Sequence, residues 1–111
     1  MKTILVDAIS TFIIKGEGIF QEMHNLLEKY PNKKIILTSA NDEQFKKFDL
    51  NNIPYEVFTL KHNPEKTDPN YYRIMLKHFN LSPEEVIYFE HKKEAVETAQ
   101  SIGIKTLFYD K

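Results

Sequence analysis

The sequence predicts an α/β fold: a three-layer, Rossmann-like sandwich in which helices cover both faces of a parallel sheet of five strands. Two features of the 111 residues predict it. Short runs of apolar and β-branched residues recur from end to end, and segments with apolar residues at helical spacing separate them. Most of these runs have continuous apolar stretches, which is typical of parallel strands buried between crossover helices. The length fits one domain, residues 1–111, around a single core.

The expected strands share a short apolar run that is bounded by polar or turn-forming residues. They cover residues 3–6, 34–38, 55–59, 86–89 and 105–109. The helical segments share apolar positions that lie three and four residues apart. They are expected at residues 19–30, from residue 41 onward, at 68–79, at 82–85 as a single turn, and at 94–102.

The first helix is expected over residues 19–30 because its apolar side chains fall on one face. Those side chains are Ile19, Met23, Leu26, Leu27 and Tyr30. Pro31 stops the helix. Gly16 and Gly18 precede it and indicate a turn in the connection from the first strand.

Local signals mark where the later helices begin and end. Asn41, with Gln44 three residues later, forms a capping-box pattern. Asp68 followed by Pro69 is typical of an N-cap with proline in the first helical position. Gly103 follows the last helical segment, where a left-handed residue commonly ends a helix.

Composition excludes several classes of protein. The formal net charge of −1 argues against a protein that tracks nucleic-acid phosphates. The absence of cysteine excludes disulfides, cysteine-ligated zinc and thiol nucleophiles, and it suits a reducing compartment. No apolar run is long enough for a membrane span, and Asp7 interrupts the first run too early for a signal peptide. We therefore expect a cytoplasmic protein without a nucleic-acid or membrane partner.

Polar side chains follow the expected strands where those strands end. Asp7 ends the first, Thr38 and Ser39 end the second, and Glu90 ends the fourth. Lys66 precedes a helix N-terminus between the third and fourth strands. Ligands of parallel sheets bind beyond the carboxyl ends of the strands. We therefore expect these side chains to converge at one edge of the sheet.

Four phrases at these positions resemble the motifs of the haloacid dehalogenase superfamily, most of whose members are phosphotransferases. ILVDAIST resembles the first motif, a strand ending in D-x-D-x-T, and IILTSAN resembles the second, a strand ending in Thr or Ser. KTDPNYY is similar to the third-motif phrase K-P-D-P-x-x-Y. VIYFEHKKEAVETAQSIGIKTLFY resembles the fourth, in which a strand ends in an acid pair and a helix follows. The resemblance covers nearly the whole chain and implies the fold expected above.

The resemblance also implies a role for each strand-end residue. Asp7 would attack phosphorus and form an aspartyl-phosphate. Thr38, or Ser39 beside it, would donate a hydrogen bond to the phosphoryl oxygens. Lys66 would pair with the nucleophile and with the phosphoryl charge. Asp7 and Glu90 would hold Mg²⁺, which prefers oxygen ligands.

The sequence departs from the family's pattern at Ile9. In the family, this position is occupied by the second acid of the first motif. That acid protonates the leaving group and then activates water. Isoleucine moves no proton, and positioned acid–base catalysis is worth about 10²- to 10⁴-fold. We therefore expect slow turnover or a long-lived phospho-aspartate.

The fourth motif departs as well, with Glu90 and His91 in place of two acids. Glutamate is one methylene longer than aspartate and Mg²⁺ demands near-ideal octahedral geometry, so a weak metal site is expected. His91 is expected to be solvated rather than a ligand. The other histidines, His24, His62 and His78, have no partner in the sequence and are expected to be structural or exposed.

Two functions of different classes follow from these observations. The first is a capless hydrolase, because the intervals between Asp7, Thr38 and Lys66 are too short for a cap domain. It would cleave a phosphorylated small molecule or macromolecule with Mg²⁺, slowly because of Ile9. The second is a pseudoenzyme whose strand-end surface binds a phosphorylated ligand or a protein without turnover. An unrelated α/β binding domain, for example a receiver-like one with a phosphorylatable aspartate, stays open as a third.

Overall fold

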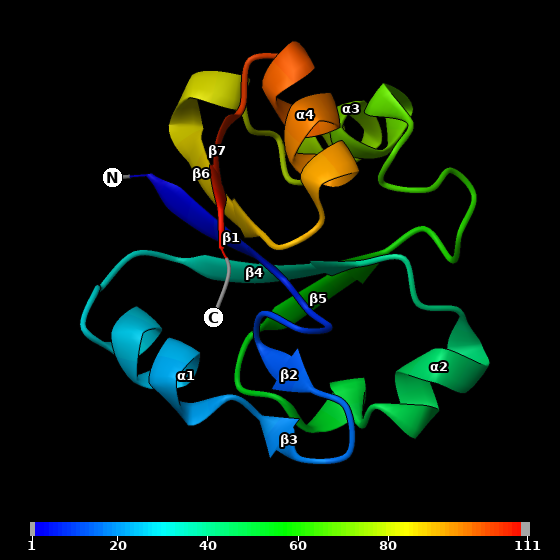
Figure 1. Ribbon diagram of the computed structural model, residues 1–111. Coiled ribbons are helices and arrows are strands. Elements are labelled where there is room, and N and C mark those ends of the chain that lie inside the picture. The colour runs from blue at the N-terminus through cyan, green and yellow to red at the C-terminus, as the bar shows by residue number, and fades with distance from the viewer. Residues whose placement is uncertain (1, 110–111) are drawn as a thin grey trace.

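A parallel sheet of five strands forms the centre of the molecule (Figure 1). The computed structural model describes residues 2–109. The strands of the sheet are β1 (Thr3–Asp7), β4 (Lys34–Thr38), β5 (Glu56–Thr59), β6 (Val86–Glu90) and β7 (Lys105–Phe108). A separate hairpin pairs β2 (Ile13–Ile14) with β3 (Gly18–Ile19). The α-helices are α1 (Gln21–Glu28), α2 (Asp42–Lys47), α3 (Pro69–His78) and α4 (Lys93–Ser101), and single 3₁₀ turns cover Leu50–Asn52 and Pro83–Glu85.

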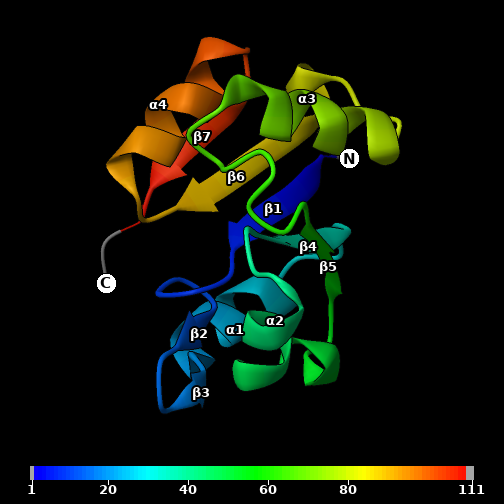
Figure 2. The same cartoon turned by 90° about the vertical axis from the view of Figure 1, so that its right-hand side faces the viewer.

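Helices cover the two faces of the sheet, as the sequence predicts. Helices α3 and α4 lie on one face, and α1, α2 and the β2–β3 hairpin lie on the other (Figures 1 and 2). The side chains of β1 alternate between these two cores. Leu5 packs in the core that contains Tyr72 and Met75 of α3, whereas Val6 packs in the core that contains Met23 of α1. The predicted three-layer α/β fold is confirmed. No helix within residues 2–109 combines the length and the apolar character that crossing a bilayer requires.

The capping residues found in the sequence act as expected. Asn41 Oδ1 accepts a hydrogen bond from the Gln44 backbone at 2.9 Å, and Gln44 Oε1 accepts one from the Asn41 backbone at 3.0 Å. Asp68 accepts from the backbone of Asn70 at 2.9 Å, so it satisfies a free N–H in the first turn of α3. Gly103, with φ of +91°, follows α4 in the left-handed conformation that favours glycine.

The first helix is shorter than the prediction. Ile19 pairs with Ile13 in the hairpin, so α1 begins at Gln21. Tyr30 lies beyond the end of the helix and is 49% exposed, although its spacing placed it on the apolar face. Apolar residues keep the helical spacing from the hairpin, through α1 and past the end of the helix. The spacing alone therefore does not show where the helix begins and ends.

The strand order β5-β4-β1-β6-β7 positions the functional edge of the sheet. The chain builds outward from β1 to β4 and β5, then crosses back to β6 on the other side of β1. This reversal on the two sides of β1 creates the crevice where open α/β sheets bind ligands. The pairings of Asp7 with Leu37 and of Val6 with Phe89 bring the carboxyl ends of β1, β4 and β6 to one level.

Candidate active site

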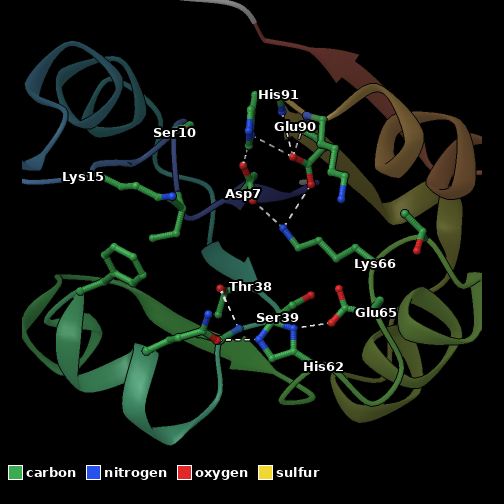
Figure 3. Close-up of a pocket in the computed structure, with 16 residues that line it drawn as sticks. Asp7, Ser10, Lys15, Thr38, Ser39, His62, Glu65, Lys66, Glu90 and His91 are labelled. Atoms are coloured by element: carbon green, nitrogen blue, oxygen red, sulfur yellow. Dashed lines mark hydrogen bonds and ion pairs between the residues drawn. The ribbon is translucent and has the colours of Figure 1, made fainter.

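A pocket of about 410 Å³ lies at the carboxyl ends of these strands (Figure 3). All five residues that the sequence selects line it: Asp7, Thr38, Ser39, Lys66 and Glu90. The predicted convergence is therefore present in the structure. Ile9 also lines the pocket, so an apolar side chain occupies the place where the family's pattern has its second acid.

Asp7 is held by three donors at the end of β1. Its Oδ1 accepts a hydrogen bond from the Lys66 ammonium at 2.5 Å. Its Oδ2 accepts from the Thr11 hydroxyl at 3.1 Å and contacts His91 Nδ1 at 2.6 Å. The residue is only 5% exposed. This buried carboxylate therefore has a fixed orientation and lies between two basic groups.

Lys66 bridges the two carboxylates of the site. Its ammonium lies 2.5 Å from Asp7 Oδ1 and 3.1 Å from Glu90 Oε1. Burial opposes the charged form of Lys66, but the two carboxylates outweigh it and raise the pKa above that of an ordinary lysine. The side chain therefore supplies a permanent positive charge at the floor of the pocket.

Glu90 is the last residue of β6 and is almost completely buried. Its Oε1 accepts from the Tyr88 hydroxyl at 2.5 Å and from Lys66. Its Oε2 accepts from the backbone N–H groups of His91 and Lys92 at 2.9 and 3.1 Å. Burial alone would raise the pKa of Glu90, but the Lys66 charge and then the side chains of His91 and Tyr88 hold it well below its usual value. Glu90 is thus a buried, fully hydrogen-bonded carboxylate.

Thr38 and Ser39 form the β4 side of the pocket. Thr38 is buried, and its Oγ1 accepts a hydrogen bond from the Ala40 backbone at 3.2 Å. Because this oxygen is already an acceptor, its own proton is available for a ligand. The Tyr71 hydroxyl donates to the Thr38 carbonyl at 2.7 Å and ties this strand end to α3.

His91 contacts Asp7, which the expectation of a solvated loop histidine missed. Hydrogen bonds to Asp7 and then to Glu90 raise the pKa of His91 to about 9, against a smaller opposing effect of burial. The imidazole is therefore protonated at neutral pH. Its position directly after a strand-end acid is the signal in the sequence that could have revealed this contact.

Raising the pH from about 6 to about 10 is expected to destabilise the protein through His91. Its folded-state pKa of about 9 lies above the ordinary 6.5. The stabilisation is therefore fully present below about pH 6.5 and is lost as the pH rises through 9. Since 40% of the side chain is exposed, screening by solvent limits the expected loss to about 1 kcal/mol. Urea unfolding in the presence of EDTA measures it. A decline of equal size in His91→Gln would contradict this assignment.

Asp7, Glu90 and His91 bring possible metal-ligand atoms within 4.8 Å of one another. The two carboxylates fit the oxygen preference of Mg²⁺. However, His91 occupies Asp7 Oδ2 and also lies 3.3 Å from Glu90 Oε2. The two carboxylates can hold the metal once the imidazole of His91 moves away from them. Until then, the protonated imidazole competes with a cation for the same oxygens.

His62 is a second pocket residue that the sequence did not reveal. It was expected to be structural or exposed, and it is exposed. Its ring also has partners that the sequence does not indicate: Nδ1 contacts Glu65, and Nε2 lies 2.5 Å from Gln44 Oε1. All three residues line the pocket. One partner is three residues away, but the other comes from α2, which only the folded chain brings near.

Comparison with known proteins supports the family. No family model matches the chain. The phosphorylated carbohydrates phosphatase of Thermotoga maritima, a curated relative, is 32% identical over 90 residues. The match covers 74% of this chain and 42% of the relative, so the chain spans less than half of that protein's length.

Two solved structures share the fold. One, an uncharacterized protein from Corynebacterium glutamicum, has a TM-score of 0.67 at 15% identity, over 100% of this chain and 86% of that one. The other is the core domain, determined by NMR, of a candidate phosphoglycolate phosphatase from Streptococcus pneumoniae. It has a TM-score of 0.64 at 16% identity, over 99% of this chain and 80% of that one. The fold, the relative and the motif phrases at the strand ends agree: the chain is a member of the haloacid dehalogenase superfamily.

Proposed function

We propose that the chain is a phosphohydrolase-like member of this superfamily, in which Asp7 attacks the phosphorus of a phosphoester. The observation that carries the proposal is the Asp7 carboxylate, oriented by Thr11 and paired with Lys66 at the floor of the pocket. The name of the Thermotoga maritima relative supports a phosphorylated substrate. Between β1 and α1 the described residues hold only the β2–β3 hairpin, which supports a capless site that accepts a small molecule or a macromolecule.

The chain's own residues suit the first chemical step. An oxygen of Asp7 forms a bond to phosphorus while the bond from phosphorus to the leaving oxygen breaks. Lys66 neutralises charge on the transferring group, for which a point charge is sufficient. The free proton of the Thr38 hydroxyl reaches a phosphoryl oxygen, and Ser39 adds a second hydroxyl in the same wall. Water then cleaves the aspartyl-phosphate and releases inorganic phosphate.

Mg²⁺ held by Asp7 and Glu90 would supply further positive charge against the phosphoryl group. His91 must first leave Asp7 Oδ2, because that oxygen already accepts from the Thr11 hydroxyl and from the imidazole. Glu90 keeps its orientation through the backbone N–H groups that follow it.

Replacing His91 by alanine is expected to strengthen Mg²⁺ binding about tenfold at neutral pH, because the competing cation is removed. Isothermal titration calorimetry of the wild type and the variant measures the change. Lys92→Ala is the matched control, since it removes a neighbouring positive charge of the pocket without freeing Asp7. Equal affinities of wild type and His91→Ala would show that the imidazole does not compete.

A second candidate function is a pseudoenzyme that binds a phosphorylated ligand without turnover. Two observations favour it: Ile9 supplies no proton, and the basic groups of Lys66 and His91 already neutralise Asp7. The pocket would then hold a phosphoryl group through Lys66 and Thr38 only.

Trapping of the intermediate separates the two functions. The chain is incubated with Mg²⁺ and acetyl phosphate, quenched in acid and digested, and the peptide that contains Asp7 is examined by mass spectrometry. The enzyme is expected to show a phosphoryl adduct on Asp7 that hydroxylamine removes. Binding of inorganic phosphate without any adduct would favour the pseudoenzyme.

A further inference from the structure

We propose that His62 is the general acid and base of this pocket, positioned by Glu65, and that it replaces the carboxylate missing at Ile9. The inference rests on the proposed function, since it concerns the proton that accompanies phosphoryl transfer to Asp7. The candidate is a residue of the connection between β5 and α3, outside the four motif phrases.

His62 lies on the wall of the pocket opposite Asp7 (Figure 3). It lines the same pocket as Asp7, and Figure 3 shows it on the opposite side of that pocket. In-line displacement places the leaving oxygen on the far side of phosphorus from the attacking carboxylate. A proton donor for that oxygen therefore belongs on the wall that His62 occupies. His62 is 40% exposed and remains accessible to a ligand.

Both ring nitrogens of His62 face oxygen atoms of neighbouring side chains. Nδ1 faces a carboxylate oxygen of Glu65, and Nε2 faces Gln44 Oε1 at 2.5 Å. That Gln44 atom is identified as oxygen because it also accepts the Asn41 backbone N–H. A neutral imidazole donates from one nitrogen only, whereas an imidazolium donates from both. The surroundings therefore offer an acceptor for a proton on either ring nitrogen.

The backbone holds the ring in place at an energetic cost. Lys61 and His62 both have positive φ, 54° and 66°, a conformation that is unfavourable for residues other than glycine. The Lys61 N–H donates to the Thr59 hydroxyl at 3.0 Å, and that hydroxyl donates to the Ala40 carbonyl at 2.6 Å. These contacts anchor the strained turn to the ends of β4 and β5. Such conformations gather at functional sites.

The proton balance follows from these positions. In the first step, His62 Nε2 leaves Gln44 Oε1 and turns to the leaving oxygen. Asp7 bonds to phosphorus, the bond to the leaving oxygen breaks, and that oxygen takes the proton from Nε2. Neutral His62 remains beside the vacated position. In the second step, a water molecule attacks phosphorus from that side and gives a proton to Nε2, and the bond to Asp7 breaks. Inorganic phosphate, a free carboxylate and a protonated His62 result.

The first test varies the leaving group. His62→Gln is expected to lower phosphate release from phenyl phosphate by about 10²-fold or more. Release from p-nitrophenyl phosphate, whose leaving group needs no proton, is expected to fall less than about tenfold by the same reasoning. His78→Gln, at the exposed C-terminal end of α3 and outside the pocket lining, is the matched control and should match the wild type. Equal losses on the two substrates would overturn the proposal, because a structural defect does not distinguish leaving groups.

The second test is rescue by the missing acid. Ile9→Asp supplies a carboxylate in the pocket and is expected to make His62 dispensable. In the Ile9→Asp background, His62→Gln should then change phenyl phosphate turnover by less than about threefold. The effects of the two substitutions would therefore be strongly non-additive. Full additivity of the two substitutions would overturn the proposal. Glu65→Gln should weaken catalysis less than His62→Gln and shift the pH profile, since Glu65 acts only through the ring.

Failure of this inference differs from failure of the proposed function. If wild type releases phosphate, Asp7→Asn does not, and His62→Gln leaves both substrates unaffected, the nucleophile stands and the role of His62 is refuted. If neither phosphate release nor an adduct on Asp7 is detected in wild type, both are refuted.

Discussion

Replacing Lys66 by methionine is expected to lower the free energy of unfolding by about 3–5 kcal/mol at neutral pH. The ammonium lies between Asp7 and Glu90, and all three side chains are at most 10% exposed. Methionine preserves most of the stem but leaves two buried carboxylates with only the partly exposed imidazolium of His91 as a counter-charge. The loss therefore comes from uncompensated charge and not from a cavity. Urea unfolding followed by circular dichroism measures it.

The pH dependence identifies this cause. The Lys66 charge and the donors around Glu90 hold its folded-state pKa below the ordinary value, against the effect of burial. Its stabilisation is therefore present above the unfolded-state pKa and is lost as the pH falls through the folded-state value. The difference between wild type and Lys66→Met should shrink in acid. Lys92→Met is the control for an exposed lysine, and a loss there of equal size would contradict the account.

A second substitution tests the same network. Adding Glu90→Gln to Lys66→Met removes one of the two uncompensated carboxylates. The double variant is expected to recover at least about 1 kcal/mol relative to Lys66→Met, because the two sites are in contact and do not act additively. A further loss of stability would indicate that Glu90 contributes mainly through its hydrogen bonds to the following backbone.

Replacing Asp7 by asparagine is expected to reduce phosphate release by at least about 10³-fold, because an amide does not attack phosphorus. The substitution keeps the size of the side chain and one oxygen for Lys66. The amide also removes the charge that pairs with His91, so thermal unfolding must be recorded beside the assay. A folded variant without turnover would assign the nucleophile.

The matched control for this change is Asp68→Asn. Asp68 caps α3, and asparagine caps a helix about as well as aspartate does. Both turnover and stability should remain close to wild type. Phosphate release that persists unchanged in Asp7→Asn would place the reaction elsewhere and would remove the basis of the proposed mechanism.

Features whose causes are local could be predicted from the sequence. The apolar strands, the capping box at Asn41 and Gln44, and the N-cap at Asp68 depend on contacts within a few residues, and the structure contains all of them. The convergence of Asp7, Thr38 and Glu90 was predictable for a different reason. Parallel strands end at the same edge, so a residue at each end approaches the others whatever the details of packing.

Only the tertiary structure decided where the histidines of the pocket lie. His91 is 84 positions away along the chain, and its ring meets the carboxylate because β1 and β6 are neighbours in the sheet. His62 meets Gln44 because a strained turn and the first turn of α2 face the same pocket. Sequence patterns report the conformation that a segment prefers locally. The protonation of His91 and its competition with a metal ion for Asp7 depend on distances between segments. The order of the strands in the sheet sets those distances.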